Sequence, residues 1–230
     1  MQLNKYIDAM EVKLLHLSMK VISVNRGDVK TVSWRGKDVK TGIFKYPANG
    51  TIYLGIEDVK DDAVVDRRFH GGIDKAVYAY SYDHYPYWKE KFPDADWDFG
   101  MFGENLTIEN MNEDEMNIGA IYQVGDAEIQ VCQPRQPCFK LGIRFNTQSV
   151  LKTFVNSSFS GVYFRVLKSG RVNVGDDLNL IFEEPDAPSI KDVYELLYHK
   201  KPGMEKMVES ILNCNPLPKS IKESVLHTQA

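Results

Sequence analysis

The feature that most constrains the fold is a long succession of short β-type segments, which runs from about residue 13 to residue 187. Apolar and β-branched residues dominate each segment, and residues that favour turns separate one segment from the next. Strands are expected at 15–24, 29–34, 42–46, 51–56, 76–80, 106–108, 121–124, 127–132, 161–167 and 177–182. Many short strands at this spacing favour a closed or nearly closed β-barrel, with a hairpin turn at Gly125 and Asp126. The sequence therefore predicts a mainly β fold.

Short helices are expected beside and after these strands. Residues 83–92 and 147–157 predict two peripheral helices, and an acidic, proline-bearing linker follows at 183–188. Beyond it, Ile190, Val193 and Leu196 fall on one helical face.

Two further helices are expected near 204–212 and 218–227. We divide the chain into an N-terminal extension (1–12), a barrel domain (13–187) and a small three-helix domain (188–230). The helical tail is too short to bury a core of its own. It either docks on the barrel or is stabilised by a partner, including a second copy in a homodimer.

Composition excludes several classes of protein. The net charge of −4 and the pI of about 5.8 argue against a nucleic acid polymer as partner. Three cysteines without a CxxC spacing indicate neither a disulfide framework nor a cysteine-rich zinc site, and they fit the reducing cytoplasm. No apolar stretch is long enough to span a membrane, and no signal peptide is expected at the N-terminus.

The segment at 133–141 carries the strongest chemical signal. Cys138 directly follows Pro137, with Arg135 three residues before it and Lys140 two residues after it. The two prolines at 134 and 137 stiffen the segment, and neighbouring cations favour a thiolate, which is both a nucleophile and a metal ligand. A buried structural cysteine is the alternative, but the prolines and cations favour a functional one.

A second group of residues lies at 66–76, just before a predicted strand. Gly71 and Gly72 let the backbone approach a ligand closely. Four cationic or imidazole side chains surround this turn: Arg67, Arg68, His70 and Lys75. The group suits a phosphate or another oxyanion, and a glycine turn with solvated charges is an equally good reading.

A third group, at 102–106, places Glu104 beside Asn105 at the entry to a strand. Glu104 could donate a proton or orient a cation, and Asn105 can donate and accept hydrogen bonds. Taken alone, a simple turn before a strand is the more economical interpretation.

These groups, in this order and followed by residues 161–176 and a helical tail, resemble the MOSC domain, named after the C-terminal domain of molybdenum-cofactor sulfurases. The resemblance covers about residues 13–185 and is closest to the stand-alone bacterial branch. It implies a β-barrel that binds the molybdenum cofactor, a pterin with a phosphate. It also implies reduction of N-hydroxylated compounds, such as hydroxylaminopurines, to amines.

The same resemblance implies roles for particular residues. Cys138 would ligate molybdenum and take part in catalysis, with Glu104 and His70 as candidates for proton handling. Residues from all three groups would bind the cofactor: Arg67, Arg68, His70, Gly71, Gly72, Lys75, Asn105, Arg135 and Lys140. The chain shows no ferredoxin-type cysteine pattern, flavin fingerprint or pyridoxal-phosphate domain, so electrons are expected from a separate protein.

Two alternatives remain open at this stage. The domain could be a non-catalytic carrier of the molybdenum cofactor or of sulfur held as a Cys138 persulfide. It could also be a thiol hydrolase that uses Cys138 and His70, although the sequence marks no oxyanion hole and no residue that would orient His70.

Overall fold

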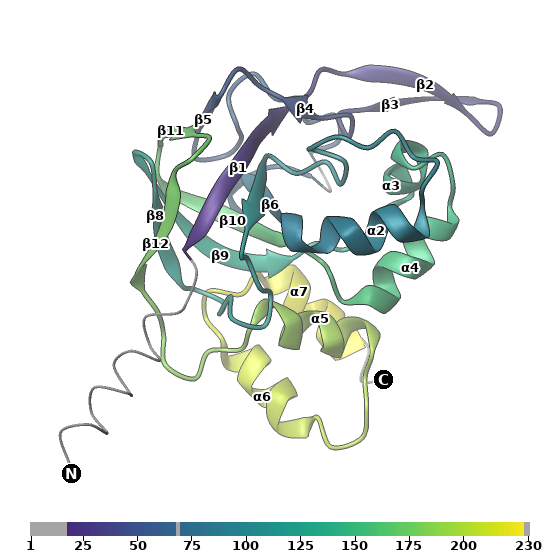
Figure 1. Cartoon of the computed structure of the whole chain (residues 1–230). Helices are drawn as coiled ribbons and strands as arrows, with labels where there is room; N and C mark the ends of the chain where they lie inside the picture. Colours follow the sequence, from purple (N-terminus) through teal and green to yellow (C-terminus); the bar gives the residue numbers. More distant parts are fainter. Residues whose placement is uncertain (1–17, 68–69, 228–230) are drawn as a thin grey trace, which may run out of the picture.

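A closed β-barrel forms the centre of the protein in the computed structural model, which describes residues 18–67 and 70–227 (Figure 1). Seven strands follow one another in the order β12, β8, β9, β10, β6, β7, β1, and pairing of β12 with β1 closes the ring. Their bounds are Met19–Arg26 (β1), Val77–Ser81 (β6), Leu106–Glu109 (β7), Ile121–Val124 (β8), Ala127–Pro134 (β9), Val162–Lys168 (β10) and Asp177–Phe182 (β12). Neighbouring strands are antiparallel except for β6 and β7. The predicted barrel is confirmed.

Further strands extend the barrel at one end. They are β2 (Lys30–Trp34) and β3 (Lys37–Thr41), which form a projecting hairpin, β4 (Tyr46–Pro47), which pairs with β1, and β5 (Thr51–Leu54), which pairs with β11 (Gly170–Asn173). The predicted strand at 42–46 is wrong. Gly42 packs so closely that a Cβ there would collide with the carbonyl oxygen of Ala63. The β2–β3 hairpin ends at this point, and the residues that follow line the pocket described below.

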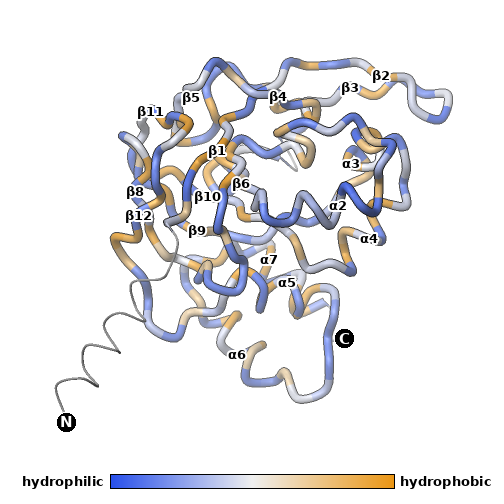
Figure 2. Tube along the Cα trace, in the orientation of Figure 1, coloured by the Kyte–Doolittle hydropathy of each residue, from blue (hydrophilic) through white to orange (hydrophobic). Residues whose placement is uncertain are grey.

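Apolar residues recur along the strands of the barrel (Figure 2), and their buried side chains form its core. Ile129 and Val131 of β9 are fully buried, as are Val162 and Phe164 of the neighbouring β10. Burial of such side chains stabilises the fold by about 1.5–3 kcal/mol each. The barrel was predicted from the number and spacing of these short strands and from the turns between them.

Short helices cover the side of the barrel next to the pocket. They are the 3₁₀ turns η1 (Ile73–Lys75) and η2 (Tyr82–His84), followed by α2 (Tyr85–Lys91), α3 (Phe139–Arg144) and α4 (Ser149–Ser157). Trp88 of α2 stacks near Phe154 of α4, with ring centroids 5.9 Å apart, and both lie in an aromatic cluster with Phe102. The helices predicted at 83–92 and 147–157 are confirmed, whereas α3 was not foreseen.

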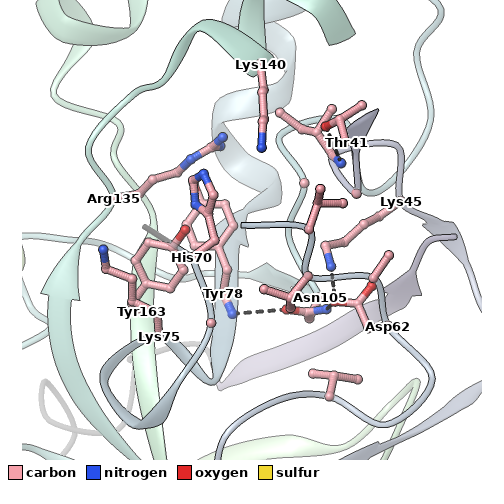
Figure 3. A pocket seen from close by; sticks show the side chains of 18 of the residues that line it. Thr41, Lys45, Asp62, His70, Lys75, Tyr78, Asn105, Arg135, Lys140 and Tyr163 are labelled. Carbon is pink, nitrogen blue, oxygen red and sulfur yellow. Dashed lines mark hydrogen bonds and ion pairs between the residues drawn. The ribbon is translucent and has the colours of Figure 1, made fainter. Parts of the chain in front are cut away.

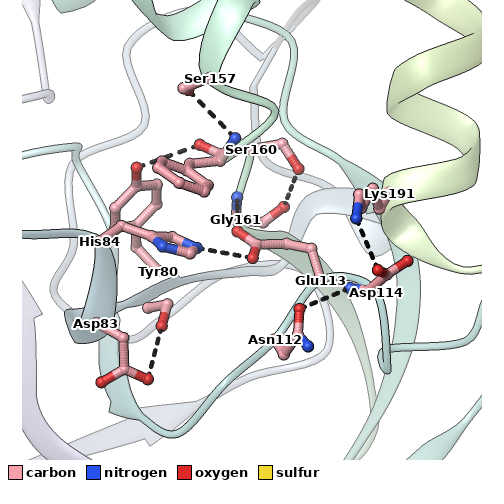
Figure 4. Close-up of polar contacts among 12 residues, drawn as sticks. Tyr80, Asp83, His84, Asn112, Glu113, Asp114, Ser157, Ser160, Gly161 and Lys191 are labelled. Carbon is pink, nitrogen blue, oxygen red and sulfur yellow. Dashed lines mark hydrogen bonds and ion pairs between the residues drawn. The ribbon is translucent and has the colours of Figure 1, made fainter. Parts of the chain in front are cut away.

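Three helices follow the barrel: α5 (Ile190–Tyr198), α6 (Glu205–Asn213) and α7 (Lys219–His227). Their buried apolar residues belong to the same cluster that fills the barrel. Of the two alternatives stated above for the tail, docking on the barrel is the one that the structure shows. A polar contact fastens it: Lys191 Nζ lies 2.6 Å from Asp114 Oδ2 (Figure 4). The preceding Glu113 accepts the Gly161 N–H and pairs with His84 Nε2, at 3.0 and 2.8 Å.

Residues 1–12, predicted as an extension, lie outside the described residues. Within 18–67 and 70–227, no helix has the length and apolar character that a membrane-spanning segment requires.

Candidate functional site

A pocket with about 660 Å³ of empty space opens beside the barrel, part of it continuous with solvent (Figure 3). Chain segments that are far apart in the sequence form its wall. The polar and catalytic-type side chains that line it are Thr41, Lys45, Asp62, His70, Lys75, Tyr78, Asn105, Arg135, Cys138, Lys140 and Tyr163. The structure thus brings the three predicted groups together in one place.

Cys138 lies where β9 gives way to α3. It has extended backbone angles (φ −127°, ψ 160°), and its carbonyl oxygen accepts the Leu141 N–H at 2.9 Å, which starts the helix. The residue is partly exposed and lines the main pocket. It also lines an adjoining outer pocket together with Pro137 and Phe139. Cys138 therefore lies where the two cavities meet.

Arg135 is buried beside the cysteine and held from several directions. Its Nη1 donates to the carbonyl oxygen of Phe102. Its guanidinium lies over the ring of Tyr78, at 5.0 Å from the centroid, and over that of Phe154, at 5.7 Å. These contacts fix a positive charge in the pocket wall.

Two lysines add to this positive charge. Lys75 and Lys140 line both cavities, and the Lys75 ammonium lies 6.0 Å from the centroid of the Tyr163 ring. Burial lowers the pKa of Lys75. Among the described residues that line the main pocket, Asp62 is the one with a carboxylate. The basic residues in the same lining are Lys45, Lys75, Arg135 and Lys140, so positive charge exceeds negative charge there. Such a field favours an anionic ligand.

His70 lines both cavities and is a neutral group at pH 7. Burial, followed by the charges of Arg135, Lys140 and Lys75, lowers its pKa from 6.5 to about 4. A neutral imidazole can donate and accept hydrogen bonds. It is a poor source of protons near neutral pH as long as the surrounding charge is not compensated.

The glycine pair makes the turn that carries His70 into the pocket. Gly71 and Gly72 have φ angles of 73° and 78°, in the region that side chains disfavour. A Cβ on Gly71 would also lie 2.7 Å from Asp58 Oδ1 and 2.9 Å from Val64 Cγ1. Gly71 lines the main pocket, and Gly72 caps η1 instead.

Arg67, which precedes this turn, does not reach the pocket. The Arg67 side chain is 59 % exposed, pairs with Asp58 and lines neither cavity. Arg68 lies outside the described residues. Its predicted role stays a prediction.

Glu104 lies next to the pocket-lining residues Gly103 and Asn105 but does not itself line either cavity. It is fully buried, and its carboxylate accepts hydrogen bonds from Tyr85 Oη, Thr107 Oγ1 and the N–H groups of Gly100 and Phe102. Burial raises its pKa. This geometry indicates a role in holding the 100–104 turn.

The sequence reasoning missed Lys45 and Asp62. Both side chains are buried and form an ion pair in the pocket, where Asn105 Nδ2 donates to Asp62 Oδ2 at 3.0 Å. Lys45 lay in a segment interpreted as a strand, and Asp62 belongs to an ordinary acidic turn. Neither carried a motif that could have revealed it.

A group of three or more His, Cys, Asp or Glu side chains that could hold a bare metal ion does not occur within residues 18–67 and 70–227. The pocket offers one thiol, a set of cations and hydrogen-bonding side chains.

Comparison with known proteins agrees with this architecture. Residues 66–179 match the MOSC domain. The chain is 35 % identical over 206 residues to YflK, an uncharacterized protein of Bacillus subtilis, which covers 90 % of this chain and 92 % of YflK. It superposes on the crystal structure of YiiM from Geobacillus stearothermophilus with a TM-score of 0.76 and 32 % identity, over 92 % of this chain and 100 % of that one.

A third relative is a protein of Gibberella moniliformis named reductase. It is 32 % identical over 201 residues, which cover 86 % of this chain but 35 % of the reductase. The barrel, the matched domain and the relatives define a MOSC-domain protein. The chain belongs to that family and is related to YiiM and YflK.

Proposed function

We propose that the protein is a molybdenum-cofactor-dependent reductase that converts N-hydroxylated compounds, such as hydroxylaminopurines, to amines. One observation carries the proposal: Cys138 lines a pocket together with Lys75, Arg135 and Lys140. The match to the MOSC domain and the relative named reductase support it.

The residues in the pocket fit the chemistry of this cofactor. A thiolate is a soft ligand that suits molybdenum, and Cys138 would provide it. Lys75, Arg135 and Lys140 would neutralise the phosphate of the pterin. When bound, the cofactor supplies the electrons of the reduction.

The outer cavity suits the substrate. Phe139 is an unusually exposed aromatic residue directly after the cysteine, and it lines this cavity with Pro137 and Tyr163. Flat apolar surfaces of this kind stack against planar bases. The amide side chains of Gln133 and Gln136 also line the cavity and can bond to polar atoms at the edge of a base. A separate electron-donor protein would restore the reduced cofactor.

The deciding experiment measures molybdenum in protein expressed in a host that makes the cofactor. We expect near-stoichiometric molybdenum in the wild type and loss of metal and of reductase activity in Cys138→Ala. Cys214→Ala is the matched control, because Cys214 is a partly buried cysteine in the helical tail and lines neither cavity.

Activity is assayed with a hydroxylaminopurine and an artificial electron donor. Full reductase activity in Cys138→Ala would contradict the proposal. Molybdenum loading without turnover under every donor would instead favour a carrier of the cofactor.

A further inference from the structure

Gln133 of β9 is a buried polar residue in the wall of the outer cavity. It is 2 % exposed and lies opposite Tyr163 of β10 in the strand register. Cys138 lines the same cavity. Since buried polar groups in folded proteins are hydrogen-bonded, the bonds that the Gln133 amide already makes determine what it can offer to a ligand.

The two ends of the Gln133 amide have different tasks. Its Nε2 donates to the carbonyl oxygen of Asp74 at 3.1 Å. Because only the NH₂ end of an amide can donate to a carbonyl, this bond fixes the direction in which the side chain is turned. Oε1 is therefore the end that remains to accept a hydrogen bond in the outer cavity.

Asp74, which holds the amide, is itself anchored by Arg165 of β10. Arg165 Nε donates to Asp74 Oδ1 at 2.6 Å. Arg165 Nη1 donates to Gln130 Oε1 at 3.2 Å and to the carbonyl oxygen of Pro216 at 2.7 Å. These bonds tie η1 to the barrel and to the loop between α6 and α7, so the amide of Gln133 is fixed before a ligand arrives.

The oxygen of Gln133 differs from the other polar groups of this cavity. The two lysines of the lining, Lys75 and Lys140, can only donate. The other side chains that are able to accept are Asp66, His70, Gln136 and Tyr163. Gln133 is buried, whereas those four residues are half-buried or exposed. An acceptor shielded from water costs more free energy when it is left unpaired.

We propose that Gln133 selects substrates that carry a hydrogen on the reacting nitrogen, with Asp74 and Arg165 as positioning residues; this inference rests on the proposed function. The Gln133 Oε1 atom accepts the N–H of a hydroxylamino group and holds that group in the cavity that Cys138 lines. A hydroxylamine whose nitrogen carries two carbon substituents has no such hydrogen, and it leaves this buried oxygen without a partner.

The reaction leaves the selected bond intact. A substrate R–NH–OH takes up two electrons and two protons, its N–O bond breaks, and R–NH₂ and water leave. The electrons come from the separate donor protein through the cofactor, and the protons come from solvent. The N–H that Gln133 holds is present in both substrate and product.

The first test uses the molybdenum-loaded wild type and two substrates that differ at one position. They are 6-hydroxylaminopurine and its derivative with a methyl group in place of the hydrogen on the reacting nitrogen. We expect kcat/KM to be about 10–100-fold higher for the compound with the N–H, because the methylated one forfeits a hydrogen bond and strands its acceptor.

The second test separates this hydrogen bond from the bulk of the methyl group. Gln133→Met keeps the length of the side chain but lacks the oxygen. It should lose most of the 10–100-fold advantage for the N–H compound, while the methylated compound and the molybdenum content change little. Gln123→Met is the matched control, because Gln123 Nε2 also donates to a carbonyl, that of Gly125 at 2.6 Å, but the residue lines neither cavity.

Arg165→Met tests the positioning role. Without Arg165 the Asp74 segment is released, so KM for the N–H compound should rise and the preference over the methylated compound should shrink. A merely structural role would lower the rates with both compounds by the same factor and leave their ratio unchanged. Circular dichroism confirms that each variant is folded.

A readout independent of turnover is NMR of the glutamine side-chain amides in the molybdenum-loaded protein without an electron donor. The Gln133 resonance should shift on addition of 6-hydroxylaminopurine and shift less with the methylated compound. Neither this measurement nor the comparison of the two substrates requires a variant to fold.

Three results would overturn the assignment. The first is a wild type that reduces both compounds equally well, and the second is a Gln133→Met variant that keeps the full preference, because another acceptor such as Asp66 would then make the bond. The third is a Gln133 resonance that does not respond to the N–H compound. Failure of the proposed function looks different: the wild type would then reduce neither compound, and both proposals would fall.

Discussion

At the residue scale, the surroundings of Glu104 distinguish a structural carboxylate from a proton donor. Four donors converge on its two oxygens, from Tyr85, Thr107 and the backbone at Gly100 and Phe102. The Phe102 carbonyl in turn accepts from Arg135. The carboxylate thereby holds the turn that positions one wall of the pocket.

We therefore expect Glu104→Gln to destabilise the protein by about 1–3 kcal/mol, because the new amide would direct a donor at a backbone N–H that needs an acceptor. Urea unfolding of the cofactor-free protein measures this change. A proton donor would behave in the opposite way, with unchanged stability and a large loss of turnover at normal molybdenum content. That outcome would restore the sequence-based role of Glu104.

The sequence revealed those site residues whose chemistry is concentrated in a few adjacent positions. Arg135, Cys138 and Lys140 lie within six residues of sequence, and all three line the pocket. Residues this close in sequence stay close together in the folded protein, so the sequence pattern was enough to group them. Lys45 and Asp62 are seventeen positions apart, and the fold brings them together. Arg67 shows the converse: it lies three residues from His70 but points to Asp58 instead of the pocket.

At the element scale, most strands and the amphipathic helices were predictable, but the strands β3 and β11 and the helix α3 were not. This helix has six residues, follows Pro137 and contains Gly142, which is an unfavourable residue within a helix. The close approach of Gln148 explains the glycine, because a Cβ on Gly142 would overlap its side-chain amide. Tertiary packing therefore overrides local propensity at the helix that carries Lys140.

The start of α5 offers a direct test of local stabilisation. Ser189 and Asp192 form a capping box: Ser189 Oγ accepts the Asp192 N–H at 3.1 Å, and Asp192 Oδ2 accepts the Ser189 N–H at 2.9 Å. Removing the hydroxyl leaves an N–H at the helix start without its acceptor.

We expect Ser189→Ala to lower the stability by about 1 kcal/mol. For a protein of this size, that loss corresponds to a decrease in Tm of about 2–4 °C. Thermal unfolding followed by circular dichroism measures it. Ser224→Ala is the control, because Ser224 is a half-buried serine of α7 whose hydroxyl donates to the Ser220 carbonyl oxygen of its own helix. Equal effects of the two substitutions would argue against the cap.

At the scale of the whole molecule, the barrel and the helical tail share one core. Ile190, Val193 and Leu196 of α5 are fully buried in the cluster that also contains Ile118 and Val131. The backbone joins the two parts as well, since the Ile190 N–H donates to the Met116 carbonyl at 2.9 Å. The boundary drawn at residue 187 therefore separates segments of sequence that are joined by a continuous interior.

A barrel and a helical tail that share one core should unfold together in one step. We expect calorimetry of the full chain to show a single transition whose calorimetric and van't Hoff enthalpies agree.

Removing residues 188–230 would forfeit about 1.5–3 kcal/mol for each fully buried apolar side chain of the tail and expose the barrel face beneath it. The shortened chain should therefore aggregate or bind a hydrophobic dye such as ANS. A soluble shortened barrel with native strand signals, together with two separate transitions in the full chain, would show instead that the tail is an independent domain. The full-length Ser189→Ala variant serves as reference, because it weakens α5 without removing the surface that covers the barrel.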